Sequence, residues 1–495
     1  MEKVNKRIIL IQPPLLHSNM DVDIIQKKYW AELRNKVSEI LKRIDAGKHL
    51  TEYKNNFSGF IEPNIGLLYV GGALKKAGYE LEYIDFHLKD AEIRTKYDRP
   101  INMEDIKIFF DNFTIEDSTL VGISPLTINY NWATKIAKVV KSKNKSTKVV
   151  LGGVHVSFEY EKILKNEDAI DFIIVGEGEK STVELADYLY SYSKNINDLK
   201  KIRGIAFKED GKVCFTGMRD FISDLDSLAY PLYELYPKEY LTNSMIRVIT
   251  SRGCSNLCSF CVPSNFFNKL RFRNYVNVVN EIEYYYKDHN HTLYMIGDLN
   301  FLNDYAYARK FCEEIIKRRL KIFWMCQSRV ELIDREITKL MVKAGCIMIC
   351  LGIESADQNI LNASNKNINT EMSINACKIV KEAGINLFTF WVFGLPGETH
   401  ESAHTTIKLL RKLLDIKLID YTHCTVCVPY PGTQLFKNPE KFNIQILSND
   451  YNKYWMGCDF LGSDLPVIKT EELSNFEIYA YWQMALAVVA GNLNK

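Results

Sequence analysis

The segment "TSRGCSNLCSFC" (residues 250–261) places three cysteines within eight residues of one another: Cys254, Cys258 and Cys261. It overlaps the end of an apolar run, residues 245–251, that is typical of a buried strand. Spacings of four and three would also suit one face of a helix, so a buried helical stripe is the alternative. Gly253 before the cluster and Pro263 after it, with serines and an asparagine between the cysteines, favour a loop.

The composition is that of a globular protein with more than one domain. The chain has 495 residues, of which 47% are apolar and 25% charged, so two or three domains with ample cores are expected. A formal net charge of +2 gives no reason to expect nucleic acid or an anionic membrane as a partner. No apolar run reaches the length of a membrane span, and the apolar part of the start, "MEKVNKRIILIQPP", is too short for a signal peptide. These features predict a cytoplasmic protein.

The chain has twelve cysteines, which are expected to be reduced in the cytosol and to serve as core residues, ligands or nucleophiles. Several lie in apolar stretches and are predicted to be buried: Cys312, Cys326, Cys346, Cys350 and Cys377. Cys424 and Cys427 form a C-x-x-C pair in a strand-like segment, where this spacing puts the two side chains on opposite faces. A second metal site is the alternative to a structural role, and the sequence leaves that choice open.

The first two hundred residues alternate between strands and helices. Five short segments are almost continuously apolar, as strands covered on both faces are: residues 7–12, 80–86, 120–124, 148–153 and 171–179. Helical patterns lie between them at residues 66–79, 131–143 and 179–192. This alternation predicts a parallel, doubly wound sheet, which binds ligands at the carboxyl ends of its strands. An extra amphipathic stretch, residues 24–44, is expected to be a lid or a packing helix.

Residues 221–237 have the acids, prolines and tyrosines of a linker, and the alternation resumes after them. Six further strands are expected, at residues 245–251, 292–297, 322–326, 346–354, 387–394 and 421–428. Helical segments separate them, for example residues 334–345 and 370–384, each of which ends in glycine. Six such units predict a barrel or part of one, with its chemistry at the carboxyl ends of the strands. A helical segment at residues 474–491 is expected to pack over the barrel.

The number of cysteines in the loop indicates which metal centre it suits. A zinc site would need a fourth ligand at motif spacing, and none follows. A cluster of four irons normally takes four cysteines. Three thiolates therefore leave one iron open to a ligand that does not come from the protein.

The motif C-x-x-x-C-x-x-C after the first strand of a partial barrel resembles the radical SAM superfamily, in which S-adenosylmethionine (SAM) binds the open iron. The resemblance implies that Phe260 lies beside the adenine and that other strand ends contact SAM. The implied contacts are Gly297, Asp298 and Asn300 for the amino group, Arg329 for the carboxylate, Glu354 and Ser355 for the ribose, and Leu395 and Pro429 in turns that hold the adenine. Taken singly, those two turns are ordinary turn chemistry, and their recurrence at successive strand ends favours a functional role.

A parallel sheet in front of such a barrel resembles the cobalamin-binding radical SAM class, and this resemblance covers nearly the whole chain. It implies an α/β chain with four parts: a Rossmann-like cobalamin-binding domain at residues 1–215, a linker at 216–244, a partial (β/α)6 radical SAM barrel at 245–438 and a mostly helical extension at 439–495. Cobalamin folds of this type carry Ser-x-Leu and, further along the chain, Gly-Gly. Here Ser124-Pro125-Leu126 closes the third strand, and Gly152-Gly153 closes the fourth.

The resemblance implies that Ser124 and Thr127 contact the dimethylbenzimidazole tail of cobalamin and that the two glycines let the backbone approach it. Other residues in the segments that resemble this class are Leu126, His155, Gly176, Glu177 and Gly178. If either motif stood alone, its residues would be ordinary loop residues.

The sequence departs from many cobalamin proteins in the motif that supplies the lower ligand of cobalt. Many cobalamin proteins supply a histidine from Asp-x-His-x-x-Gly after the first strand, but here that strand ends "IQPPLLHSN". "DFHLKD" (residues 85–90) follows the second strand and lacks the glycine, so His87 is predicted to be a surface or packing residue. The class resembled generally lacks this ligand, which leaves the lower ligand undetermined and His17 as an outside candidate.

Together these resemblances imply an oxygen-sensitive, cobalamin-dependent radical SAM methyltransferase with a [4Fe–4S] cluster, SAM and cobalamin as cofactors. In this interpretation the reduced cluster cleaves SAM, the 5′-deoxyadenosyl radical takes hydrogen from an unactivated carbon, and methylcobalamin supplies the methyl group. A one-electron reductant such as flavodoxin or ferredoxin is an implied partner.

Three alternatives remain from the sequence. The first is an enzyme of the same build that uses the radical for cyclisation, ring contraction or another rearrangement. A second hypothesis has the barrel without cobalamin, and a third is a non-catalytic iron–sulfur or cobalamin sensor. The substrate, whether a small molecule, a peptide or a lipid, is not determined by the fold.

Overall fold

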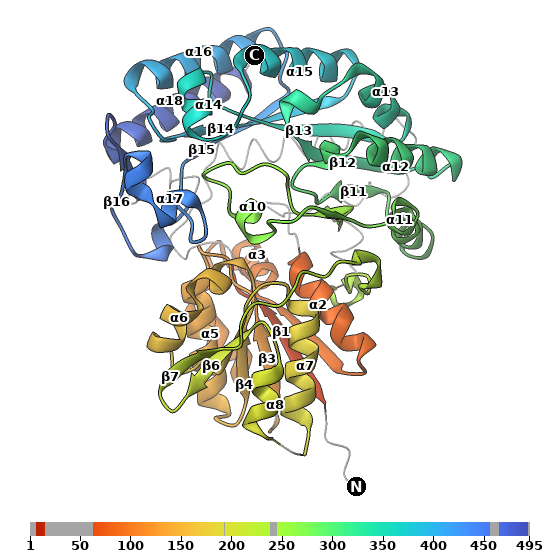
Figure 1. Ribbon diagram of the computed structural model, residues 1–495, viewed down its shortest axis with the longest axis vertical. Coiled ribbons are helices and arrows are strands. Elements are labelled where there is room, and N and C mark those ends of the chain that lie inside the picture. The colour runs from red at the N-terminus through yellow and green to blue at the C-terminus, as the bar shows by residue number, and fades with distance from the viewer. Residues whose placement is uncertain are drawn as a thin grey trace. The chain divides into compact units, whose positions relative to one another are not determined.

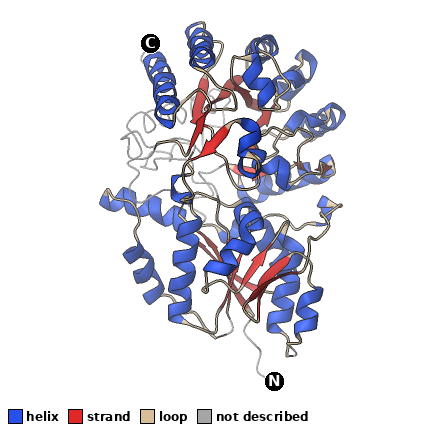
Figure 2. Cartoon of the chain, turned by 60° about the vertical axis from the view of Figure 1, so that its left-hand side comes forward, coloured by secondary structure: helices blue, strands red, loops and turns tan. Residues whose placement is uncertain are grey.

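The computed structural model describes residues 6–14, 63–117, 119–192, 194–237, 245–455 and 465–493. Within these residues the chain forms two compact units, one ending at residue 237 and the other starting at residue 245, and each is built on its own sheet (Figures 1 and 2). The amphipathic stretch at residues 24–44 and His17 lie outside the described residues. No helix among those described is both long and apolar enough to span a membrane.

The first unit contains a seven-stranded sheet in the order β2-β1-β3-β4-β5-β6-β7. Its strands are β1 (Arg7–Gln12), β2 (Glu80–Asp85), β3 (Leu120–Ile123), β4 (Lys148–Leu151), β5 (Phe172–Ile174), β6 (Ile205–Glu209) and β7 (Lys212–Phe215). The first five pair with one another in parallel, which confirms the predicted doubly wound sheet. The order reverses between β1 and β3, the position at which such sheets bind ligands.

The hairpin β6–β7 was not predicted. Both strands pair antiparallel at the edge of the sheet, and a two-residue turn, Asp210-Gly211, joins them. Asp-Gly between two short strands is a strong hairpin signal, so the sequence did carry the information.

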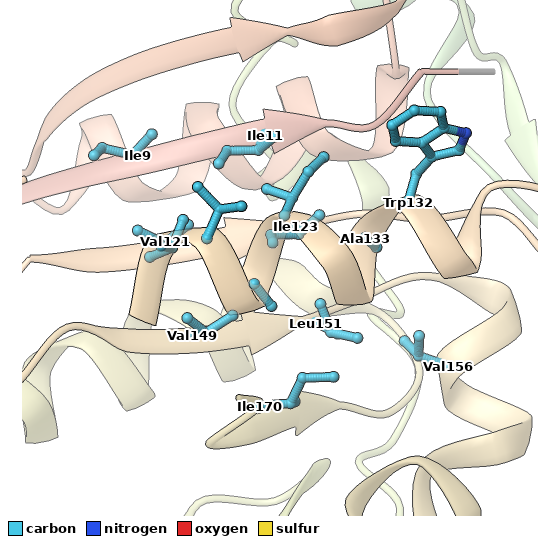
Figure 3. Close-up of a cluster of buried hydrophobic side chains, with 14 of the residues drawn as sticks. Ile9, Ile11, Val121, Ile123, Trp132, Ala133, Val149, Leu151, Val156 and Ile170 are labelled. Carbon is cyan, nitrogen blue, oxygen red and sulfur yellow. The ribbon is translucent and has the colours of Figure 1, made fainter. Parts of the chain in front are cut away.

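Alternate residues of the strands supply two separate cores. Ile9, Ile11, Val121 and Ile123 pack with α4, α5 and α6 on one face, as Figure 3 shows in part. Ile8, Leu10 and Leu120 pack with α2, α7 and α8 on the other face. The helices are α2 (Ile65–Lys76), α3 (Phe86–Tyr97), α4 (Met103–Asp111), α5 (Tyr130–Lys143), α6 (Val154–Asn166), α7 (Gly178–Tyr190) and α8 (Ile196–Lys201). Of these, α2, α5 and α7 were predicted.

The segment predicted to be a linker packs on the first unit in its described part. The backbone N–H of Leu232 donates to Leu68 of α2 at 3.2 Å, and that of Ile222 donates to the Glu177 carboxylate at 2.8 Å. The segment contains two 3-10 turns, η1 (Leu225–Ser227) and η2 (Tyr233–Leu235). The domain boundaries drawn from the sequence remain predictions.

The second unit contains a six-stranded sheet in which every neighbouring pair is parallel and the strands follow chain order. The strands are β8 (Ile246–Val248), β11 (Leu293–Ile296), β12 (Phe323–Ser328), β13 (Cys346–Glu354), β14 (Asn386–Phe393) and β15 (Tyr421–Val426). The helices that connect them are α11 (Tyr275–His289), α12 (Tyr305–Lys317), α13 (Arg335–Lys343), α14 (Gln358–Ala363), α15 (Thr370–Glu382) and α16 (His400–Asp415). Most of them line the outside of the curved sheet (Figure 1). This is the predicted partial barrel.

The end of the chain packs against the last two strands of this barrel. Helix α18 (Asn475–Leu493) contacts α16, β14 and β15, and Trp482 Nε1 donates to the Cys424 carbonyl at 2.9 Å. This confirms the predicted helical segment and its packing. The smaller elements nearby are α17 (Gln434–Lys437) and an antiparallel pair that was not predicted, β16 (Ile444–Ile446) and β17 (Ile468–Thr470).

Candidate functional site

The cysteine loop, residues 253–270, leaves the carboxyl end of β8 and is closed at its base by two short strands. These are β9 (Ser251–Arg252) and β10 (Arg271–Phe272), which pair antiparallel. Gly253 has a φ of +101°, and a Cβ there would lie 2.5 Å from the Lys269 carbonyl oxygen. Only glycine allows the two ends of the loop to approach this closely. The three cysteines precede α10 (Val262–Phe266) and are not helical, so the alternative of a helical stripe is wrong.

A second loop, which follows α14, supports the cysteine loop from the side. The backbone N–H of Ser259 donates to the Ser364 carbonyl at 3.0 Å, and Asn365 Nδ2 donates to the Leu257 carbonyl at 2.7 Å. Within the cysteine loop, the Cys261 N–H donates to the Cys258 carbonyl at 3.1 Å. These bonds hold the backbone between the cysteines without using their thiols.

Asp298 braces the start of the cysteine loop. It is 3% exposed and follows the end of β11. Its Oδ1 accepts from the backbone N–H groups of Thr250 and Ser251, at 2.7 and 3.1 Å, and its Oδ2 accepts from their hydroxyls, at 2.5 and 2.6 Å. A carboxylate has about four acceptor positions, and all four are used. The carboxylate of Asp298 thus holds the loop that carries the cysteines, and its contact with the SAM amino group stays a prediction.

Burial raises the pKa of Asp298, and the hydrogen bonds from Ser251 and Thr250 oppose that rise. Asn300, the next predicted polar residue, is also buried. Its Oδ1 accepts from Ser328 at 3.2 Å, and its Nδ2 donates to Asn303 at 2.8 Å. Gly297 lies between the last residue of β11 and Asp298. It is half-buried and donates its N–H to the Val248 carbonyl.

Two buried cations pair with carboxylates near the carboxyl ends of β12 and β13. Arg329 is 6% exposed and donates to Glu331, to the Lys366 carbonyl and, from Nη1 at 3.4 Å, to Cys258 Sγ. Lys366 Nζ pairs with Glu354 Oε1 at 2.8 Å, and both side chains are nearly buried. The fold thus links two predicted residues through Lys366, because Arg329 donates to its carbonyl and Glu354 pairs with its ammonium group.

Lys366 was missed by the sequence analysis. It lies in the loop after α14, between asparagines, where a lysine is ordinarily a solvated side chain. Glu354 has a φ of +66°, a backbone conformation that is rare for residues other than glycine and that marks functional or tightly constrained positions. The pairing of Glu354 with Lys366 depends on the tertiary structure, so the sequence did not predict it.

The other predicted SAM contacts differ in accessibility. Ser355 is fully buried, and its hydroxyl lies 3.1 Å from the hydroxyl of Thr406 on α16, so its side chain has no exposed surface for a ligand. Leu395 and Pro429 are buried in the turns after β14 and β15, and Phe260 is half-buried. The turn at Leu395 is held by Glu398, whose carboxylate accepts from the Gly394 N–H, and burial raises the pKa of Glu398 to about 8.

The three thiols suit a four-iron cluster better than a single metal ion. Within the residues that the structure describes, no three His, Cys, Asp or Glu side chains are placed to hold one ion. In a four-iron cluster each cysteine binds a different iron, so the sulfurs need not converge on one point. The backbone and side-chain N–H groups of Asn256 lie 3.5 and 3.7 Å from Cys254 Sγ, and Arg329 donates to Cys258 Sγ. These groups are placed as hydrogen-bond donors to two of the three sulfurs.

The C-x-x-C pair shows no sign of a second metal site. Cys424 and Cys427 are each 2% exposed, and burial raises the pKa of Cys424 to about 12 and that of Cys427 further. Cys427 lies beyond the end of β15, where its N–H donates to the Phe393 carbonyl at 2.7 Å. Both thiols are buried and neutral, as core residues are.

The second set of predicted residues lies at the carboxyl ends of β3, β4 and β5 in the first unit. Leu126, after β3, is 49% exposed, whereas Thr127 is 8% exposed and its Oγ1 lies 3.1 Å from His155 Nδ1. Burial lowers the pKa of His155 to about 3, so the ring is neutral. Ser124 accepts from Asn64 Nδ2 at 3.2 Å. Thr127 and His155 thus support one another beneath the exposed leucine.

Gly152 and Gly153 follow β4 and Gly176 follows β5, so the backbone at these strand ends carries no Cβ atoms. Gly153 has a φ of +117°, and a Cβ there would meet Ser124 Oγ at 3.3 Å. Ser157 bridges the two strand ends, since it donates to the Gly153 carbonyl at 2.7 Å and accepts from the Gly176 N–H at 3.0 Å. Gly152, Glu177 and Gly178 complete the edge, and Glu177 holds the segment at Ile222. A flat ligand tail can approach the backbone here, so the residues present fit the tail of cobalamin.

This edge is also supported by residues that the sequence did not predict: Asn64, Gln12 and Ser157. Asn64 caps α2 through the Leu67 N–H, its own N–H donates to Gln12 Oε1 at 2.7 Å, and its Nδ2 reaches Ser124. An N-cap asparagine before an apolar run is a sequence signal, but it indicates only the start of a helix. His87, in the first turn of α3, is a partly buried packing residue whose pKa is lowered by burial to about 4.

Two family comparisons agree with this geometry. Residues 248–410 match the radical SAM superfamily, and residues 57–186 match the B12 binding domain. The chain is 32% identical over 406 residues to an uncharacterized methyltransferase of Pyrococcus horikoshii. The alignment covers 80% of this chain and 82% of that protein. It is 28% identical over 424 residues to the anaerobic magnesium-protoporphyrin IX monomethyl ester cyclase of Rubrivivax gelatinosus. This alignment covers 84% of this chain and 71% of the cyclase.

Solved structures with the same fold include two cobalamin enzymes. The radical S-adenosylmethionine methyltransferase TsrM from Kitasatospora setae, with cobalamin and a [4Fe–4S] cluster bound, matches with a TM-score of 0.66 and 16% identity, over 97% of this chain and 91% of TsrM. The cobalamin-dependent S-adenosylmethionine radical enzyme OxsB matches with a TM-score of 0.67 and 16% identity, over 97% of this chain and 66% of OxsB. At this identity the likeness concerns the fold alone.

The first prediction concerns the three loop cysteines. Cys254→Ala, Cys258→Ala and Cys261→Ala should each abolish SAM cleavage, because losing one thiolate from a three-ligand site exposes a second iron. The measurement is 5′-deoxyadenosine release after anaerobic reconstitution, with Cys427→Ala as a control that keeps the cluster. Wild-type release in any single loop variant would contradict the assignment.

The second prediction concerns Asp298. Asp298→Ala leaves two buried N–H groups without an acceptor, at a cost of about 1–3 kcal/mol each, so iron content after reconstitution should fall. Asp298→Asn should retain more iron, because the amide oxygen can accept from both N–H groups while the two hydroxyls turn to accept from the amide nitrogen. Asp304→Asn, at the N-cap of α12, is the matched control. Equal iron content in the Ala and Asn variants would argue against a bracing role.

The third prediction concerns Gly153. Gly153→Leu should lower the cobalamin content while leaving the iron–sulfur absorption intact, because the side chain blocks the approach to the backbone. Positive φ also costs a leucine on the order of 1–3 kcal/mol. Gly78→Leu separates the two effects, since Gly78 has a φ of +90° and open space around it. If Gly153→Leu retains full cobalamin occupancy, the tail does not bind at this edge.

Proposed function

Because the chain belongs to the cobalamin-binding radical SAM enzymes, we propose that it is a methyltransferase that acts on an unactivated carbon. Its cofactors are a [4Fe–4S] cluster, SAM and cobalamin. In this proposal Cys254, Cys258 and Cys261 bind three irons of the cluster, and the edge formed by Ser124, Gly152 and Gly153 receives the cobalamin tail. The alternatives of a barrel without cobalamin and of a non-catalytic sensor have no support, because the chain matches both the cobalamin and the radical SAM families.

One observation carries the choice of methylation. The relative with 32% identity over 406 residues is named a methyltransferase, and the two chains cover each other by about four-fifths. Other relatives with lower identity include a cytidylyl-2-hydroxyethylphosphonate methyltransferase of Streptomyces wedmorensis.

When bound, these cofactors supply a 5′-deoxyadenosyl radical from SAM and a methyl group carried by cobalamin. The residues of this chain supply placement. Asp298 and Gly253 fix the backbone of the cysteine loop, while the buried pair Lys366–Glu354 presents fixed charges beside it. Charges held in a buried site need no rearrangement when the ligand reacts, which is the usual contribution of a protein to cofactor chemistry. A one-electron reductant of the flavodoxin or ferredoxin class is part of the proposal.

A second candidate function is cyclisation. The Rubrivivax gelatinosus cyclase aligns over 84% of this chain, so an enzyme with the same two cofactor domains and a different outcome is a specific alternative. Both functions use the same cysteines and the same strand ends. They differ in the fate of the SAM methyl group.

The fourth prediction follows that methyl group. Holoenzyme reconstituted anaerobically with cobalamin and reduced with titanium(III) citrate is given SAM that carries a trideuterated methyl group. A methyltransferase of this class should form S-adenosylhomocysteine, and mass spectrometry should find the label in the extracted corrinoid. With a methyl acceptor present, S-adenosylhomocysteine and 5′-deoxyadenosine should appear in about equal amounts, because one SAM is consumed for each role.

Gly153→Leu serves as the control, because S-adenosylhomocysteine should fall with the cobalamin content while 5′-deoxyadenosine release continues. If the wild-type enzyme releases 5′-deoxyadenosine but forms no S-adenosylhomocysteine and leaves the corrinoid unlabelled, methylation is excluded. Cyclisation or rearrangement then becomes the favoured function.

A further inference from the structure

The guanidinium of Arg329, a predicted SAM contact, donates a hydrogen bond to a cysteine of the loop. Nη1 lies 3.4 Å from Cys258 Sγ, which is within hydrogen-bonding distance for a sulfur acceptor. Nη2 donates to the Lys366 carbonyl, and Nε donates to the Glu331 carboxylate. Three different acceptors therefore fix the plane of the guanidinium, one on each nitrogen.

Burial makes this contact electrostatically strong. Arg329 is 6% exposed and Cys258 is 8% exposed, so little water screens the charge from the sulfur. Glu331, which balances the charge on the opposite side of the guanidinium, is more exposed, with 26% of its side chain accessible. Within the Arg329–Glu331 ion pair, the positive charge is therefore less screened by water than the negative charge, and the positive group is the one that contacts Cys258.

We propose that Arg329 tunes the reduction potential of the iron–sulfur cluster through this N–H···S hydrogen bond. The proposal rests on the cluster assignment within the proposed function, and it does not depend on whether the enzyme methylates or cyclises. Reduction adds one electron, taken from the one-electron reductant, and so adds one negative charge to the cluster and its thiolates. A cationic donor to a ligating sulfur stabilises that added charge, since hydrogen bonds to the sulfurs and local charge are among the factors that set cluster potentials. Arg329 therefore raises the potential and makes the cluster easier to reduce.

The opposing role is the one that the sequence resemblance implies, in which Arg329 binds the SAM carboxylate. In the structure its three nitrogens are already engaged by Cys258, Glu331 and Lys366. The two roles predict different reduction potentials for the cluster in the absence of SAM. If Arg329 acts only on the SAM carboxylate, its loss leaves the potential of the SAM-free cluster unchanged. If Arg329 donates to Cys258, its loss changes that potential.

The test is an EPR-monitored redox titration of the reconstituted holoenzyme in the absence of SAM. Arg329→Met removes the donors and the charge while keeping a long side chain. It should make the reduction equilibrium about tenfold less favourable, which is about 59 mV more negative for a one-electron couple. Glu331→Gln keeps the shape of the partner but removes its negative charge, so the potential should shift in the opposite, positive direction. Glu331 is partly exposed, so this variant gives an answer even if Arg329→Met fails to fold.

Arg309→Gln is the matched control. Arg309 forms an exposed ion pair with Glu336 at 2.8 Å, and its loss should not move the potential. Opposite shifts in Arg329→Met and Glu331→Gln support the proposal. An unchanged potential in both variants, together with weakened SAM binding in equilibrium titrations of Arg329→Met, would overturn it in favour of the carboxylate role. A wild-type protein that shows no reducible cluster would instead overturn the cluster assignment itself.

Discussion

Four hydrogen bonds converge on the buried carboxylate of Asp298, and the geometry of the cysteine loop depends on them. Both carboxylate oxygens accept from Thr250, which precedes β9, and from Ser251, the first residue of β9, so the chain leaves the barrel in one direction. A buried carboxylate is costly unless it is fully hydrogen-bonded, and a buried N–H group is costly without an acceptor. Donors and acceptor therefore require each other, which makes this junction rigid.

The rigid junction has a consequence for the rest of the loop. Gly253 brings the start of the loop against Lys269 at its end, so the three cysteines sit on a closed segment rather than a free one. Contacts from Ser364 and Asn365 hold the middle of that segment. Preorganised ligands lose little conformational entropy when a cluster forms, which is a general advantage of sites built on supported loops.

Charge is organised around the loop in pairs. Lys366 and Glu354 form a nearly buried ion pair, and Arg329, which is buried, pairs with the partly exposed Glu331. Buried pairs of this kind add little stability on balance, since removing two charges from water costs about as much as their attraction returns. Their retention beside a metal-binding loop is better explained by an electrostatic role, and charge beside a cluster acts on its electron affinity.

The sequence by itself determined the two parallel sheets, because strands buried on both faces are apolar without interruption and the helices between them are periodic. It also indicated the cysteine loop, since three ligands for one cluster lie within eight residues and their spacing is local. The hairpin β6–β7 was missed although its Asp-Gly turn is a local signal, because its strands lie at an edge and are short. Only the tertiary structure decided the partners of Asp298, Ser355 and Lys366. Each of these residues is hydrogen-bonded or paired with a side chain or loop at another strand end or on another helix, and such contacts depend on the path of the whole chain rather than on local spacing.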